Sequence, residues 1–229
     1  MSTTSSGDRR GVLIAIEGID GSGKGTQAAL LRDALNARGR KTALISFPRY
    51  QDTFFGARIG DFLNGRFGSL DQVHPFLAAT LFAGDRMESR SMLLEALAAH
   101  DVVILDRYVA SNIAHQAAKR EGAERKELAR WILSLEFDVN ALPRPDRTLL
   151  LDLPAATAQT LIARKNARSY TDRVADLQEA DAAYLENVRQ VYLDLAAEEP
   201  RWSLVEVERN EELRAIDDIA AEIMEAASR

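Results

Sequence analysis

The sequence predicts an α/β fold with a central parallel sheet of about five strands, on two observations. Short apolar runs without polar alternation recur along the chain, as is typical of strands covered on both faces. Longer segments with apolar residues at helical spacing lie between them, and this alternation indicates βαβ units. The apolar runs are 12–16, 42–46, 102–105 and 148–151, with the more polar 203–207 expected at an edge of the sheet.

The expected helices have recognisable start and stop signals. Segment 24–38 carries leucine and alanine on one stripe and is followed by Gly39, a common stop. Pro75 suits the first turn of a further helix. Apolar stripes over 177–195 and 216–223 predict helices near the C-terminus.

Composition limits the class of protein. The 229 residues, 46% hydrophobic and 28% charged, are enough for one domain, expected over 11–229, after a polar and disordered tail over 1–10. The net charge of −6 argues against general nucleic-acid binding, and the absence of cysteine excludes disulfides and thiolate sites. No apolar run is long enough for a membrane span or a signal peptide. We therefore expect a cytoplasmic protein with no nucleic-acid or membrane partner.

The strongest local signal lies between the first predicted strand and the first predicted helix. Residues 18–24 read Gly-Ile-Asp-Gly-Ser-Gly-Lys and match the pattern G-x-x-x-x-G-K. Glycines of this pattern let backbone amides surround phosphate oxygens, and the lysine reaches the β- and γ-phosphates. The motif indicates a P-loop NTPase-type, three-layer αβα fold that binds ATP. The expected ATP-binding residues are Gly18, Asp20, Gly21, Ser22, Gly23, Lys24, Gly25 and Thr26, with Lys24 and Asp20 also catalytic.

One position departs from the full motif. Gly25 stands where Ser or Thr would hold Mg²⁺, so the ion must depend on carboxylates and on water. Asp106, directly after an apolar run, and Asp20 inside the loop are the expected carboxylates. The sequence Lys-Gly-Thr-Gln also occurs in adenylate-kinase-like loops and favours a small nucleotide kinase over a GTPase.

A kinase needs a second anion site facing the first. The second strand is followed by Phe-Pro-Arg-Tyr at 47–50 and the third by Asp-Arg-Tyr at 106–108. Ligands of open α/β sheets bind at this end of the strands, and the arginine side chain grips phosphate oxygens in a fixed geometry. Arg49 and Arg107 therefore predict an acceptor that already carries a phosphate.

These segments, with Leu-Phe-Ala-Gly-Asp-Arg at 81–86 and Asp-Arg-Tyr-Val-Ala-Ser-Asn at 106–112, resemble the thymidylate kinase family. The resemblance runs from about residue 12 to residue 195 in motif order and is closest to actinobacterial-type members. It implies transfer of the γ-phosphoryl group from MgATP to dTMP, giving ADP and dTDP, by a homodimer.

The resemblance also implies roles by position. Phe82 would stack on thymine, Arg86 would bond its carbonyl, and Asn112 would read the base edge. Arg49 and Arg107 would hold the acceptor phosphate, Arg107 as a catalytic group. The expected substrate-binding residues are Phe47, Arg49, Tyr50, Phe82, Arg86, Arg107, Ser111, Asn112, His115 and Asp176.

Two further assignments to the site rest on less specific sequence signals. His115 stands where many relatives carry a tyrosine under the deoxyribose, and the smaller imidazole leaves room for a 2′-hydroxyl. The basic segment 164–173 is expected to be a mobile lid over ATP, with Arg168 and Arg173 as candidate catalytic cations. A solvated charged face is the other interpretation of that segment.

Three other functions stay open at this point. The acceptor could be another monophosphate such as dUMP or UMP, or an unphosphorylated deoxynucleoside. A nucleoside acceptor would need a general base and fewer arginines around it. A P-loop regulator that reports nucleotide binding to a partner would consume ATP without depending on an acceptor.

Overall fold

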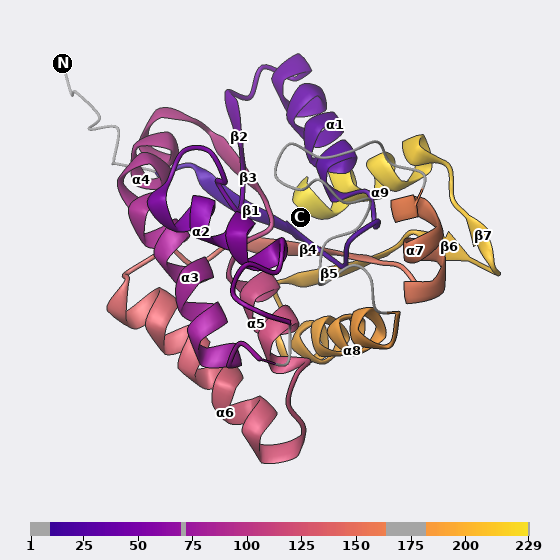
Figure 1. Ribbon diagram of the computed structural model, residues 1–229. Helices are drawn as coiled ribbons and strands as arrows, with labels where there is room; N and C mark the ends of the chain where they lie inside the picture. The colour runs from indigo at the N-terminus through magenta and orange to yellow at the C-terminus, as the bar shows by residue number, and fades with distance from the viewer. Residues whose placement is uncertain (1–9, 70–71, 164–181, 229) are drawn as a thin grey trace.

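The centre of the fold is a parallel sheet (Figure 1). The computed structural model describes residues 10–69, 72–163 and 182–228, and its five-stranded sheet has the spatial order β2-β3-β1-β4-β5. All four strand pairs of this sheet are parallel, which confirms the predicted fold class. The strands are β1 (Val12–Glu17), β2 (Thr42–Ser46), β3 (Val102–Asp106), β4 (Arg147–Asp152) and β5 (Trp202–Glu206).

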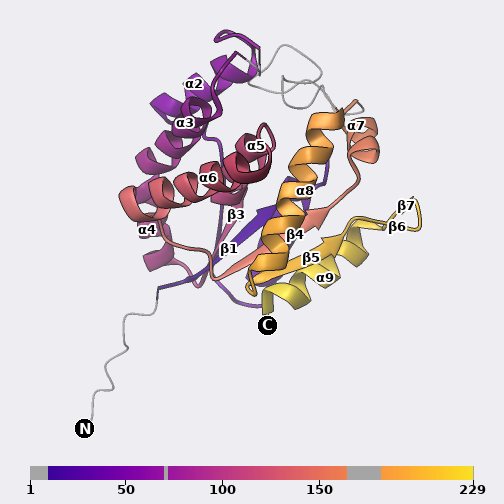
Figure 2. The same cartoon turned by 90° about the horizontal axis from the view of Figure 1, so that it is seen from below.

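Helices cover both faces of the sheet and complete three layers. Helices α1 and α9 lie against one face, and α5 and α8 lie against the other (Figures 1 and 2). A short hairpin, β6 (Glu208–Arg209) and β7 (Glu212–Leu213), follows β5. The helical elements in the described ranges are α1 (Lys24–Ala37), α2 (Phe54–Leu63), α3 (Pro75–Glu88), α4 (Arg90–Ala99), α5 (Val109–Ala117), α6 (Gly122–Leu133), the π-helix η1 (Ser134–Val139), α7 (Ala155–Ala163), α8 (Ala182–Glu198) and α9 (Ile216–Ser228).

The element boundaries follow the local chemistry of the sequence. The predicted strands occur, and β5 lies at an edge of the sheet, as expected. Helix α1 ends at Ala37, and Gly39 takes a φ of 77°, a left-handed conformation that glycine adopts readily. Pro75 is the first residue of α3, where its missing N–H has no intrahelical partner to lose.

Several expectations fall outside the described residues. Residues 1–9 of the expected tail lie there, as do 164–173 of the expected lid and the first five residues of the helix expected over 177–195. Within the described ranges, none of the helices combines the length and hydropathy that a bilayer crossing requires.

The register of the sheet brings the loops of the expected site together. Asp106 of β3 aligns with Ile16 of β1 on one side and with Ser46 of β2 on the other. The chain segments that follow these three strands therefore leave the sheet at the same edge. The phosphate loop between β1 and α1 lies at this edge.

Candidate active site

The phosphate loop depends on its glycines. Gly18, Gly21 and Gly23 take φ values of 142°, 85° and 87°, which L side chains rarely adopt. Close packing adds a second constraint, because a Cβ on Gly21 would lie 2.7 Å from the Ala158 carbonyl oxygen. Gly23 directly precedes α1, so the unpaired amides of the first helical turn face the loop. The predicted anion cradle is thus a consequence of backbone shape.

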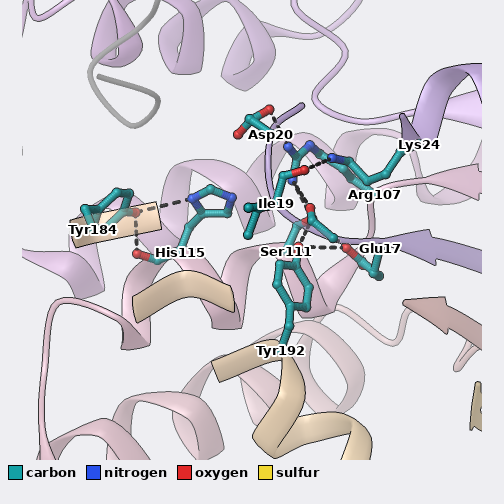
Figure 3. A network of polar contacts seen from close by, with 10 residues as sticks. Glu17, Ile19, Asp20, Lys24, Arg107, Ser111, His115, Tyr184 and Tyr192 are labelled. Carbon is teal, nitrogen blue, oxygen red and sulfur yellow. Dashed lines mark hydrogen bonds and ion pairs between the residues drawn. The ribbon is translucent and has the colours of Figure 1, made fainter. Parts of the chain in front are cut away.

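Lys24 is buried at the start of α1. Its Nζ donates a hydrogen bond to the Ile19 carbonyl oxygen at 2.7 Å (Figure 3). Burial, together with the positive charge of Arg107, lowers the pKa of Lys24 to about 8. A cavity of about 190 Å³ opens beside it and includes Asp20, Phe47 and Asp106 in its lining. An incoming polyphosphate would meet the ammonium in a setting that water screens poorly.

Arg107 spans the space between β3 and the phosphate loop. Its Nη2 lies 2.6 Å from Asp20 Oδ1, and its Nη1 donates to Ser111 Oγ at 3.2 Å (Figure 3). The backbone of Arg107 has a φ of 67°, in the left-handed region that disfavours side chains with a Cβ. Its backbone N–H donates to the Ile16 carbonyl oxygen at 3.0 Å. The guanidinium is therefore held in the same cavity as Lys24.

Glu17 connects this arginine to the rest of the fold. It ends β1 and is fully buried, and it accepts hydrogen bonds from Tyr108 N at 2.8 Å and Ser111 Oγ at 2.6 Å. The hydroxyl of Tyr192 in α8 donates to the same carboxylate at 3.0 Å (Figure 3). Because Ser111 accepts from Arg107 and donates to Glu17, the carboxylate holds the Arg107 guanidinium indirectly.

Two of the side chains expected to read the base, Arg86 and Asn112, meet at one buried carboxylate. Arg86 Nε donates to Glu136 Oε2 at 2.9 Å, and Arg86 Nη2 pairs with Glu136 Oε1. Asn112 Nδ2 donates to Glu136 Oε1 at 2.9 Å and to the Ala79 carbonyl oxygen at 3.0 Å. Phe82, on the same helix as Arg86, is only partly buried. The three predicted base-reading residues thus come from two helices, α3 and α5.

His115 lies deeper in α5. Its Nδ1 is 3.3 Å from the hydroxyl of Tyr184, which donates to the His115 carbonyl oxygen at 2.7 Å (Figure 3). Burial, assisted by the positive charge of Arg107, lowers the pKa of His115 to about 3. The imidazole is consequently neutral at physiological pH, and a contact of His115 with the substrate stays a prediction.

Comparison with known proteins decides the family. Residues 16–217 match the family model described as thymidylate kinase. The chain belongs to the thymidylate kinase family. It is 38% identical over 198 residues to a thymidylate kinase of Mycobacterium tuberculosis, covering 85% of this chain and 91% of that one. It is 35% identical over 219 residues to a thymidylate kinase of Leifsonia xyli, covering 94% of each chain.

A solved structure gives the same result. The thymidylate kinase from Candida albicans, described as revealing the origin of broad substrate specificity, superposes with a TM-score of 0.72 at 28% identity. The superposition covers 96% of this chain and 92% of that chain.

The structure does not bring every residue expected for this family into one place. Arg49 Nη1 donates to Ser89 Oγ at 3.4 Å and Arg49 Nη2 lies 3.3 Å from Asp52 Oδ2, and Arg49 is not part of the lining of the cavity that holds Arg107. Its backbone N–H donates to Asp85 Oδ2 at 3.0 Å. A contact of Arg49 with the acceptor phosphate therefore stays a prediction. Arg168, Arg173 and Asp176 lie outside the described residues.

Sequence reasoning missed three buried carboxylates, Glu17, Asp85 and Glu136. Each has an exposed fraction of 0% and receives hydrogen bonds from a predicted site residue or its neighbour. Gln116 of α5 is a further polar side chain that is fully buried. Of the three carboxylates, only Glu17 could have been found from the sequence, because it is an acidic residue at the end of an apolar strand.

The buried His115 predicts a loss of stability in acid. Between pH 6.5 and 3 the unfolded chain binds a proton at this position that the folded chain does not, so stability falls as the pH falls. We expect the wild type to lose about 2 kcal/mol more of its free energy of unfolding than His115→Gln between pH 7 and pH 5. Urea titrations at both pH values measure this difference. His74→Gln is the control, because His74 is exposed and the substitution should leave the acid loss unchanged.

Proposed function

We propose that this chain transfers the γ-phosphoryl group of ATP to dTMP and releases ADP and dTDP. The observation that carries the proposal is the shared cavity of the phosphate loop and Arg107, lined by Lys24 and Asp20. A lysine and an arginine that face one cavity at the end of a parallel sheet suit two phosphate groups brought together. Membership of the thymidylate kinase family supports dTMP as the acceptor.

The polarity of α5 supports a thymine base. Asn112 Oδ1 is buried and has no hydrogen-bond partner among the described residues, while Nδ2 donates to Glu136 and to Ala79. One turn later, Gln116 Nε2 is likewise buried without a partner there, while Gln116 Oε1 accepts from Lys119 Nζ at 3.0 Å. An acceptor and a donor one turn apart complement the N3–H and a carbonyl of thymine or uracil. Where Asn112 Oδ1 faces N3, cytosine fits less well, because its N3 carries a lone pair in place of a hydrogen.

The acceptor needs orientation more than activation. The phosphate of dTMP is already anionic, so no strong general base is required. Catalysis then depends on positioning and on cations that balance the charge of the transferred group. Lys24 supplies one charge at the donor, and Arg107, held by Asp20 and Ser111, supplies another at the acceptor.

Magnesium is proposed as the partner of ATP. Asp106 Oδ2 would lie 3.2 Å from a Cβ on Gly25, so the carboxylate borders the position where the full motif places a hydroxyl ligand. Asp106 and Asp20 offer the oxygen ligands that Mg²⁺ prefers. The described residues contain no cluster of three acidic, histidine or cysteine ligands, so water and phosphate must complete the coordination. When bound, the ion would neutralise charge on the phosphates.

Three further expectations remain proposals. Helix α2 packs against α3, and α3 packs against α4. A homodimer is supported by the exposed apolar side chains that these three helices carry, which are Phe54, Leu77, Met87 and Leu94. Light scattering would give twice the 25.3 kDa of one chain. The lid with Arg168 and Arg173, and a cytoplasmic location, are likewise proposed.

An ADP-release assay across acceptors tests the function. We expect ADP release to depend on added acceptor and to be fastest with dTMP, followed by dUMP, with dCMP, dGMP and AMP far slower. Release that does not depend on an acceptor would indicate an ATPase or a regulator. Release with thymidine in place of dTMP would indicate a nucleoside kinase.

A further inference from the structure

Glu136 joins the two helices that carry the base-reading residues. It is fully buried in η1 and receives Arg86 from α3 and Asn112 from α5 on one carboxylate. Arg86 occupies both carboxylate oxygens, through Nε at 2.9 Å and through Nη2. With an exposed fraction of 0%, Glu136 has no surface of its own to offer a ligand. Any effect on the base must pass through Arg86 or Asn112.

An ionised carboxylate constrains the direction of a neighbouring amide. It accepts hydrogen bonds and donates none, so an amide beside it must present its NH₂ group. The Ala79 carbonyl oxygen imposes the same direction on Asn112 at 3.0 Å. Both contacts are made by Nδ2, and Oδ1 is left buried and without a partner among the described residues. A buried acceptor of this kind is costly unless a ligand satisfies it.

The backbone around Glu136 supports a specialised role. Helix α6 (Gly122–Leu133) continues directly into η1 (Ser134–Val139), a π-helix, which is rare in proteins and occurs frequently at functional sites. Its widened turn contacts α3, and Glu136 reaches Arg86 and Asn112 from there.

We infer that Glu136 is a positioning residue that sets base specificity by holding Asn112 with its oxygen toward the base. This inference rests on the proposed function, because it assumes that a pyrimidine monophosphate binds beside α5. Thymine and uracil present an N3–H donor that pairs with Oδ1. Cytosine presents an acceptor at N3, which would face the Asn112 oxygen unpaired.

The test is Glu136→Gln, which keeps the size of the side chain. The glutamine oxygen can still accept from Arg86 Nε, whereas its NH₂ group, at the position of Oε1, faces Asn112 Nδ2 as a second donor. Among the described residues, the Ala79 carbonyl oxygen is then the one acceptor that still orients the amide, so Asn112 can also turn Nδ2 toward the base and accommodate cytosine. We expect the ratio of kcat/KM for dTMP to that for dCMP to fall by about tenfold or more, from the loss of one matched buried hydrogen bond.

A second acceptor separates this effect from a general loosening of the pocket. Uracil has the same N3–H edge as thymine and lacks only the 5-methyl group, so the dTMP to dUMP ratio should not change. KM for ATP should also stay at the wild-type value. Glu136→Asp is the matched variant: it keeps a group that only accepts, so the preference over dCMP should persist even if the shorter side chain lowers activity.

Several outcomes would overturn the inference. One is a folded Glu136→Gln with the wild-type dTMP to dCMP ratio, and another is an equal shift in the dTMP to dUMP ratio. A crystal structure of the wild type with dTMP provides a test that needs no variant: Asn112 should contact the base and Glu136 together, and an amide turned away from Glu136 would refute the proposal. A wild type that releases no ADP in response to dTMP would instead contradict the proposed function.

Discussion

Lys24→Ala is expected to lower kcat for dTMP phosphorylation by about 100-fold or more, comparable to the loss of one key electrostatic donor. The ammonium is buried at the start of α1 and shares its cavity with Asp20 and Arg107. Because it lies where water is scarce, its charge acts on the phosphoryl group with little screening. Steady-state kinetics with saturating dTMP and ATP measures the loss at pH 7, where a pKa of about 8 leaves the lysine mostly charged.

The melting temperature of Lys24→Ala distinguishes this loss of catalysis from unfolding. Burial disfavours the charged form of Lys24, so the folded chain carries this cation at a cost in stability at pH 7. Removing it should leave the melting temperature unchanged or raise it. Lys126→Ala, at an exposed position in α6, is the matched control and should retain wild-type turnover. Near-wild-type turnover in Lys24→Ala would remove the loop from the mechanism.

The sheet could be predicted because its signal is local. The central strands are apolar on both faces, so their burial is visible in any short window of sequence. Helix α5 was harder, since its buried face carries Asn112, His115 and Gln116 in place of a leucine stripe. Polar residues at buried positions hide the helix from an analysis of hydrophobic periodicity. All three are buried polar side chains.

The candidate site likewise has a part that the sequence predicts and a part that only the structure shows. The phosphate loop is contiguous, and its glycines and lysine could be found from spacing alone. The carboxylates that position the arginines act over long separations: Glu136 and Arg86 are 50 residues apart, and Asp85 and Arg49 are 36 apart. Glu136 stands in a segment that resembles an ordinary amphipathic helix. Only the packing of α3, α5 and η1 shows that its carboxylate is fully buried and paired.

Arg107 allows function and backbone strain to be tested together. Arg107→Ala and Arg107→Gly both remove the guanidinium that pairs with Asp20, so both should lower kcat/KM for dTMP by about 100- to 1000-fold. The two variants differ in their backbone. At a φ of 67° alanine keeps the unfavourable contact of its Cβ, whereas glycine has none.

Arg107→Gly should therefore have a free energy of unfolding about 0.5–1 kcal/mol higher than Arg107→Ala, after allowing for the greater entropy of glycine in the unfolded chain. Urea unfolding of the two variants measures the difference, and the kinetics should be alike, because neither side chain carries charge. Equal stability would mean that the hydrogen bond of the Arg107 N–H to Ile16 does not hold the backbone under strain. Wild-type activity in either variant would show that the acceptor phosphate is bound elsewhere. The expected combination is equal loss of activity with unequal stability. It would mean that the backbone at the end of β3 is strained at the residue whose guanidinium the activity needs.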